Sequence, residues 1–137
     1  MKRFVTTRVA VFLHSGDYDR IHQGLSIAAA AVASERPADV FFFWWALERL
    51  VQGRLDEPAF IPPREDVVDR FETRGAPTAG ELLRHLRESK KATFYACSGS
   101  LALVGGDPSQ IGRHVDQIVG WTRILQLTEG VTDRFYL

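Results

Sequence analysis

Residues 8–34, RVAVFLHSGDYDRIHQGLSIAAAAVAS, contain the pattern that decides the fold class. Arg8 to Leu13 form an almost continuous apolar run, which is typical of a strand covered on both faces of a sheet. His14 to Asp17 interrupt this run, and apolar residues then recur at helical spacing from about Tyr18 to Ser34. Arg36-Pro37 ends the helix, because the residue before a proline avoids helical backbone angles. A buried strand followed by a crossover helix predicts a parallel α/β sheet.

The same alternation of strand and helix recurs along the rest of the chain. Further strands are expected at 39–43, 92–97, 115–119 and 132–137, and further helices at 44–51, 79–88, 101–104 and 122–128. Thr78 and Glu81 have the spacing of a capping box at the start of one of these helices. Residues 54–75 carry three prolines and depart from the rhythm, so an excursion with a short helix is expected there. We therefore predict a single domain over residues 1–137, a three-layer α/β sandwich with a mainly parallel, about five-stranded sheet.

The charges of the 137-residue chain balance, with 17 Lys and Arg residues against 17 Asp and Glu residues. A chain without net positive charge has no long-range attraction for phosphate backbones or anionic membranes, so we expect neither nucleic acid nor a membrane as a partner. The longest apolar runs are too short to span a bilayer. Met1 to Arg3 lead into a strand-like segment, which indicates that no signal peptide is present. A cytoplasmic location is expected.

Cys97 is the single cysteine of the sequence. One cysteine excludes an intrachain disulfide, a CxxC redox pair and a multi-cysteine zinc site. The four histidines are dispersed, with neither an HExxH pattern nor a close pair, so no metal site is expected. The turn Ser15-Gly16-Asp17 has no Walker lysine, no GxGxxG pattern and no phosphate loop of the flavodoxin type. The sequence therefore predicts no cofactor.

Polar and small residues follow the predicted strands, at the edge where open parallel sheets form their ligand crevice. If the strand order is 2-1-3-4-5, the order reverses between the first and third strands, and His14 and Cys97 flank one crevice. These two residues are the catalytic candidates. The other residues expected at the crevice are Ser15, Gly16, Ser98, Gly99, Ser100 and Trp121.

Cys97 has a reactive and a structural interpretation. It directly precedes a small-residue turn and a predicted helix start, where unpaired N–H groups and the helix dipole favour a thiolate. Free cysteine is also among the most buried residue types and packs as a small hydrophobe. His14 is a candidate proton donor or thiolate partner, but His22 and His114 are equally available, and a lone histidine is usually a satisfied polar group.

Four stretches together resemble the DsrE/DsrF-like family, which includes sulfur-relay subunits; some of its members are labelled peroxiredoxin-like. They are HSGDYDRIHQGLSIAAAAVA at 14–33, DVFFFWWALERLVQG at 39–53, FYACSGS at 94–100 and VDQIVGWTRIL at 115–125. The resemblance implies a parallel-sheet domain that assembles into trimers or hexamers. In the sulfur-relay members a strand-end cysteine carries persulfide sulfur, and the matching residue is Cys97. No second cysteine is present, which excludes an internal disulfide cycle.

Two functions of different classes remain open. The first is a sulfur carrier or sulfurtransferase that holds persulfide sulfur on Cys97 and exchanges it with donor and acceptor proteins. The second is a non-catalytic homo-oligomeric module that binds a small ligand or a protein partner in the strand-end crevice. Exposure of Cys97 separates them, because an open thiol favours transfer and a thiol sealed beneath Trp121 or other aromatic side chains favours binding or packing.

Overall fold

The computed structural model describes residues 7–137 and contains a five-stranded sheet in which every neighbouring pair is parallel. The strands are β1 (Val9–Leu13), β2 (Ala38–Phe42), β3 (Ala92–Cys97), β4 (Gln117–Val119) and β5 (Asp133–Tyr136). This arrangement confirms the predicted α/β class. The expectation that Met1 to Arg3 begin no signal peptide lies outside the described residues.

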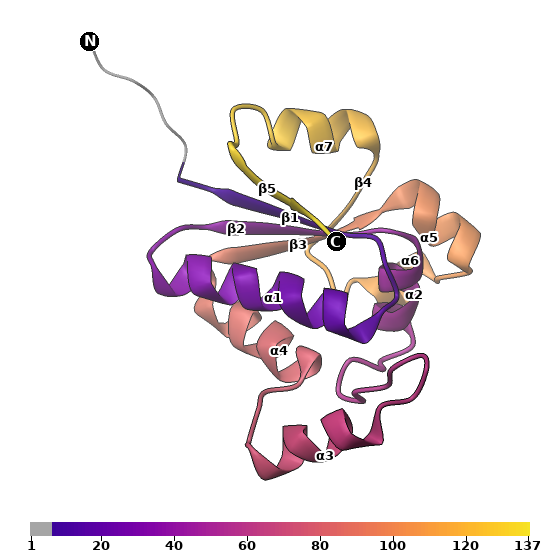
Figure 1. The fold of residues 1–137 in the computed structure, drawn as a ribbon. Helices are drawn as coiled ribbons and strands as arrows, with labels where there is room; N and C mark the ends of the chain where they lie inside the picture. The colour runs from indigo at the N-terminus through magenta and orange to yellow at the C-terminus, as the bar shows by residue number, and fades with distance from the viewer. Residues whose placement is uncertain (1–6) are drawn as a thin grey trace.

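Helices cover both faces of the sheet (Figure 1). Their bounds are α1 (Tyr18–Ala33), α2 (Trp44–Val51), α3 (Glu65–Thr73), α4 (Ala79–Ser89), α5 (Ser98–Val104), α6 (Pro108–Ile111) and α7 (Trp121–Leu127). Helices α1 and α4 pack side by side against one face, and α7 lies over the opposite face. No helix within residues 7–137 is long and apolar enough to cross a membrane.

The strand order is β4-β3-β2-β1-β5, so the conditional order 2-1-3-4-5 is wrong. The apolar runs show which strands are buried, but they carry no information about which strands are neighbours. Strands β1 to β4 are added successively toward one edge, and β5 returns to the far side of β1. The order therefore reverses between β1 and β5, which places α1 and α7 on opposite faces (Figure 1).

Two apolar cores flank the sheet. The larger core joins β1, β2 and β3 to α1, α2 and α4, with Leu25, Leu47 and Leu86 fully buried in it. The smaller core lies on the α7 side and is mainly aromatic. Its members are Ala10, Phe12, Phe41, Phe43, Tyr95, Cys97, Val119, Ile124 and Val131. Because the seven-residue α7 is the main cover on this side, the ends of the smaller core reach the surface.

An aromatic row crosses the sheet on the α7 side. Tyr136, Phe12, Phe41 and Tyr95 occupy directly paired positions on four neighbouring strands, β5, β1, β2 and β3. Successive ring centroids lie 4.6, 5.1 and 4.7 Å apart, with interplanar angles of 8°, 11° and 13°. Offset stacking of this kind adds to the stability that burial alone provides. The row ends at the edge strand β5, where Tyr136 is exposed.

The excursion is tied to the rest of the domain through Tyr18. The Tyr18 hydroxyl donates to the Leu55 carbonyl oxygen at 3.1 Å and accepts from the Ala79 N–H at 2.8 Å. Phe60 and Phe71 also meet the Tyr18 ring edge to face. One buried phenol thus holds both ends of the excursion.

Two features of the helix boundaries bear on the site. Thr78 accepts a hydrogen bond from the Glu81 N–H, which confirms the predicted cap of α4. Helix α5 begins at Ser98, three residues before the predicted start, with Cys97 at its N-cap position. The small residues Ser98-Gly99-Ser100 form its first turn, because the strand runs into the helix without an intervening loop.

Candidate functional site

A cavity of about 390 Å³ opens at the carboxyl ends of β1, β2 and β5. We call it the strand-end cavity. It is lined by Phe12, His14, Arg20, Phe43, Trp44, Ser100, Trp121, Tyr136 and Leu137. Because the strand order reverses between β1 and β5, this is the location that the topology of an open parallel sheet favours for ligand binding. The volume lies within the range of small-molecule sites.

Four aromatic rings of this cavity lie nearly parallel. The Phe12 ring makes angles of 8° with Tyr136, 22° with Phe43 and 8° with Trp121, at centroid distances of 4.6, 6.3 and 6.5 Å. Phe43 and Trp121 stack at 5.0 Å and 16°. Phe12 and Phe43 are buried, whereas Trp121 is 51 % exposed and Tyr136 is 64 % exposed. The outer two rings therefore leave aromatic surface uncovered.

Trp44 enters the cavity wall through an unusual backbone conformation. Its φ angle is +45°, in the left-handed region that side chains other than glycine rarely adopt. This conformation lets the chain turn directly from the end of β2 into α2. Such strain costs on the order of 1–3 kcal/mol and is concentrated at functional sites in proteins. A large aromatic residue in this conformation beside a cavity supports a functional assignment.

Three polar side chains complete the cavity. Arg20, in the first turn of α1, makes no side-chain hydrogen bond or ion pair with any other residue in 7–137. His14 is exposed directly after β1. Ser100 is only 4 % exposed, and within the described part of the chain its hydroxyl has no hydrogen-bond partner. The cavity therefore combines an aromatic wall with unused hydrogen-bonding groups.

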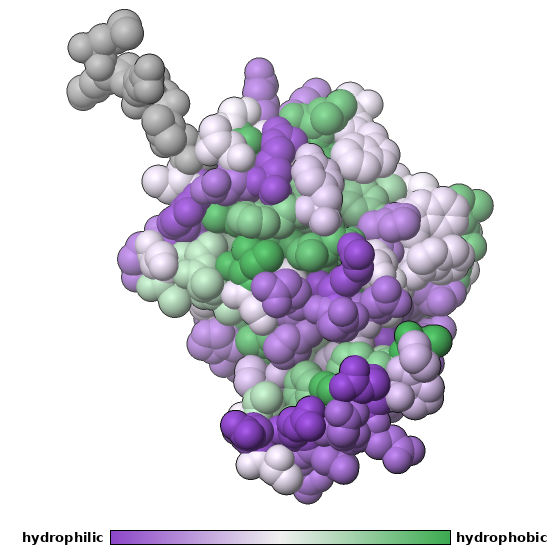
Figure 2. All heavy atoms as spheres, in the orientation of Figure 1, coloured by the Kyte–Doolittle hydropathy of each residue, from purple (hydrophilic) through white to green (hydrophobic). Residues whose placement is uncertain are grey.

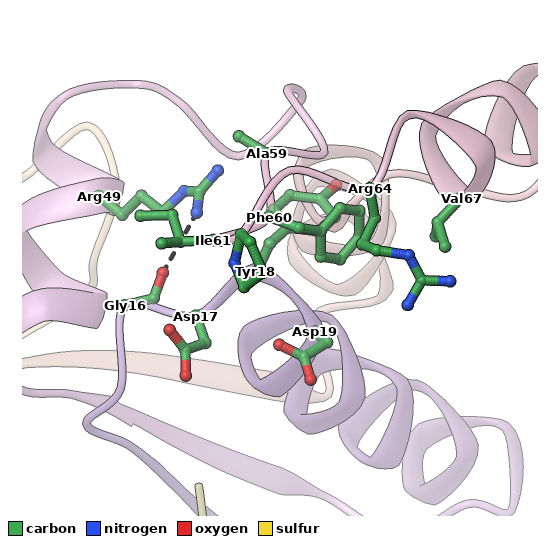
Figure 3. A pocket seen from close by; sticks show the side chains of 11 residues that line it. Gly16, Asp17, Tyr18, Asp19, Arg49, Ala59, Phe60, Ile61, Arg64 and Val67 are labelled. Carbon is green, nitrogen blue, oxygen red and sulfur yellow. Dashed lines mark hydrogen bonds between the residues drawn. The ribbon is translucent and has the colours of Figure 1, made fainter.

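A second cavity, of about 500 Å³, lies beneath the excursion, and we call it the excursion cavity (Figure 3). Asp17, Tyr18 and Asp19 line one side, and Phe60 to Pro62, Arg64 and Val67 line the other. Its charged groups have both signs, in contrast to the strand-end cavity.

Arg49 is the residue of the excursion cavity with a clear structural role. Its guanidinium donates to the Gly16 and Glu57 carbonyl oxygens and lies 5.0 Å from the centroid of the Tyr18 ring. Burial lowers the pKa of Arg49, and its Nε is buried without a hydrogen-bond partner. The side chain joins the loop after β1 to the excursion, so this cavity is a seam between two segments.

Cys97 is buried, with 6 % of its surface exposed, among Phe43, Tyr95 and Val119. It lies at the carboxyl end of β3, as predicted, but it does not line either cavity. A Cβ placed on Gly99 would have Cys97 Sγ, at 4.0 Å, as its only neighbour within that distance. The sulfur thus lies just beneath the surface of the first turn of α5.

The structure divides the predicted site residues among three places. His14, Ser100 and Trp121 meet at the strand-end cavity, and Gly16 lines the excursion cavity. Three others line neither cavity: Ser15, whose hydroxyl accepts from the Asp17 N–H, and the exposed pair Ser98 and Gly99.

The predicted single crevice between His14 and Cys97 is therefore wrong. Strand β2 lies between β1 and β3, so the backbones that carry the two residues are about 10 Å apart. Phe43 occupies the position between them. Direct proton exchange between His14 and Cys97 is incompatible with this arrangement.

Six residues of the strand-end cavity are not among the predicted site residues: Phe12, Arg20, Phe43, Trp44, Tyr136 and Leu137. The position of Trp44 after the second strand was a usable signal. Tyr136 and Leu137 depended on knowing that β5 is the neighbour of β1. A metal site has no support in the described residues, since no three His, Cys, Asp or Glu side chains in 7–137 are grouped to hold an ion.

Comparison with protein-family models gave no match, and comparison with curated proteins gave none either. The class that the structure defines is an α/β protein with a five-stranded, fully parallel sheet and helices packed on it. The resemblance to the DsrE/DsrF-like family stays a prediction from the sequence.

Proposed function

We propose that this protein is a cytoplasmic, non-catalytic binding module whose strand-end cavity holds a small ligand. The observation that carries the proposal is the aromatic strand-end cavity, with the Arg20 guanidinium and the Ser100 hydroxyl at its wall and neither side chain hydrogen-bonded within residues 7–137. The position at the reversal of strand order and the strained backbone of Trp44 support the same site.

A fragment screen read by thermal unfolding tests the binding function. Trp121 and Trp45 are equally exposed, at 51 % each, but only Trp121 lines the cavity. Fragments that bind should raise the Tm of the wild type and of Trp45→Ala, and should raise that of Trp121→Ala much less. At 100 times its Kd, a ligand stabilises the folded state by about 2.7 kcal/mol. Equal loss of the ligand effect in both variants, or no stabilising fragment at all, would contradict the proposal.

Persulfide carriage by Cys97 is the second candidate, favoured by the position of Sγ 4.0 Å from where a Cβ on the exposed Gly99 would lie. The Cys97 thiolate would attack the outer sulfur of a persulfide donor, the S–S bond of the donor would break, and the donor thiolate would leave. Cys97 would then carry one reducible sulfur atom, ready for transfer to an acceptor thiol. The exchange needs no further oxidant, because the sulfane sulfur keeps its oxidation state.

Intact mass after treatment with a low-molecular-weight persulfide distinguishes the two candidates. Sulfur carriage predicts one added sulfur that a reductant removes and that Cys97→Ser abolishes. It also predicts that Gly99→Val slows both sulfur gain and alkylation by iodoacetamide, because the new side chain fills the approach to Sγ. If native Cys97 reacts only after unfolding in urea, sulfur carriage is rejected and the buried thiol acts in packing alone.

We further propose that the protein is a homo-oligomer, with a trimer or hexamer implied by the resemblance. Figure 2 shows a band of apolar surface between β5 and α1, and a shallow cavity lined by Val9, Ile27, Ala31 and Phe135 lies there. Strand β5 is an edge strand, and exposed edges with apolar neighbours favour association. Light scattering coupled to size exclusion tests the proposal. A monomer at all micromolar concentrations would contradict it.

A further inference from the structure

We infer that the ligand of the strand-end cavity is a flat aromatic anion, a ring system that carries a carboxylate or phosphate group. The inference rests on the proposed binding function and names the chemical class of the ligand. It follows from three properties of the cavity: the parallel orientation of its rings, the sign of its charged side chains and the unused donors at its wall.

The orientation of the rings favours a planar ligand. Phe12 and Phe43 are buried and Trp44 is partly exposed, so the most accessible aromatic surface belongs to Trp121 and Tyr136. Both rings lie within 8° of the plane of Phe12, and their orientations therefore match each other closely. A planar ring entering parallel to them gains offset stacking in addition to burial. A saturated ring of the same size gains burial alone.

The charged side chains favour an anion over a cation. Aromatic walls also bind organic cations, which interact with the faces of Trp and Tyr rings. Here the lining includes Arg20 and His14 and contains no acidic side chain. Arg20 has no ion-pair partner within residues 7–137, so its guanidinium is available to pair with a ligand. A bound cation would be repelled by this guanidinium, whereas an anion would pair with it.

The free donors match the acceptors of a carboxylate or phosphate group. Arg20 presents several N–H donors, and Ser100 presents a hydroxyl that no described group pairs with. Carboxylate and phosphate oxygens accept several hydrogen bonds, and bonds to a charged donor are the stronger kind. His14 is exposed at the same cavity and has an N–H donor in either neutral tautomer.

Four probes separate shape from charge when titrated into the full chain by calorimetry. They are 2-naphthoate, neutral 2-naphthamide, the 2-naphthyltrimethylammonium cation and cyclohexanecarboxylate. We expect 2-naphthoate to bind at least about 10-fold more tightly than each of the others. Arg20→Gln should weaken the binding of 2-naphthoate about 10-fold and leave the affinity for 2-naphthamide unchanged. Arg123→Gln is the matched control, because Arg123 is exposed on α7 and does not line the cavity.

Three results would overturn the ligand class while leaving the binding function intact. Equal or tighter binding of the cation or the amide would refute the charge argument, and equal binding of cyclohexanecarboxylate would refute the stacking argument. Binding that Arg20→Gln and Arg123→Gln weaken equally would also refute it. If none of the four probes binds at millimolar concentration, the class is rejected, and the Trp121→Ala fragment screen then decides separately whether the cavity binds ligands.

Discussion

Replacing Tyr18 with phenylalanine removes one oxygen atom from the contact that anchors the excursion. In the wild type this hydroxyl pairs with the Leu55 carbonyl and the Ala79 N–H, both in buried surroundings. The Leu55 carbonyl oxygen keeps a second donor, the Gly80 N–H at 2.9 Å. The Ala79 N–H loses its partner, and an unpaired buried donor costs about 1–3 kcal/mol. We expect a loss of about 2 kcal/mol in the free energy of unfolding.

Urea denaturation and calorimetry measure this loss. With an unfolding entropy of about 2.1 cal/mol/K per residue, 137 residues give about 0.29 kcal/mol/K, so Tm should fall by about 7 °C. Tyr136→Phe is the matched control, because its exposed hydroxyl has no partner within residues 7–137 and its loss should change stability by less than about 0.5 kcal/mol. If the two variants are equally stable, the anchoring role of Tyr18 is refuted.

Three further predictions concern charge and packing. Burial, with Arg87 and Arg113 nearby, lowers the pKa of His114, so the unfolded state binds more protons once the pH falls below about 6.5. The stabilising contribution of this neutral histidine is complete above that pH and is lost as the pH falls through the folded pKa. His114→Gln should therefore lose less stability than the wild type between pH 7.5 and pH 5. If urea denaturation gives the same loss of unfolding free energy for both proteins over this pH range, the linkage is refuted. Gly24→Ala should lower the free energy of unfolding by about 1–2 kcal/mol, although alanine has the better helix propensity, because the new Cβ would lie 2.4 Å from Leu13 Cδ2. A rise in Tm would contradict this and show that the core rearranges to accept the methyl group. Arg8→Ala should lower the free energy of unfolding by about 3 kcal/mol, because it leaves the buried Asp39 carboxylate without its ion pair. Asp39→Asn should lower it less, because Arg8 can turn toward water; urea denaturation that finds Asp39→Asn the less stable variant would refute this reasoning.

The elements of the fold could be predicted from the sequence because the apolar pattern is strong. The run from Val9 to Leu13 is buried at every position, and Ala92 to Cys97 matches the observed β3 at both ends. Strand order could not be predicted in this way. The buried strands β1, β2 and β3 are apolar enough to pair with several neighbours. The shorter β4 and β5 contain polar and exposed residues, which are typical of edge strands, but nothing in the sequence marks β5 as the partner of β1.

The site could be predicted only in part, for the same reason. His14, Ser100 and Trp121 were found because the carboxyl ends of strands are the usual place for ligands. Tyr136 is not predicted because its contribution depends on the pairing of β5 with β1, and Arg20 is not predicted because it lies in the first turn of α1 and not at a strand end. The importance of Cys97 was judged from its position in the chain, whereas its accessibility depends on how Phe43, Tyr95 and α7 close over the smaller core.

The most direct test of the binding site is the set of indole N–H signals of the three tryptophans in a ¹⁵N-labelled sample. Trp44 and Trp121 line the strand-end cavity, whereas Trp45 follows Trp44 in α2 and lies outside the lining. Titration with any fragment that stabilises the protein should shift the Trp44 and Trp121 signals saturably and with one common Kd, while the Trp45 signal moves much less. Saturable shifts confined to backbone signals of the excursion, with Trp44 and Trp121 unmoved, would show that ligands bind elsewhere and would contradict the assignment of this cavity as the functional site.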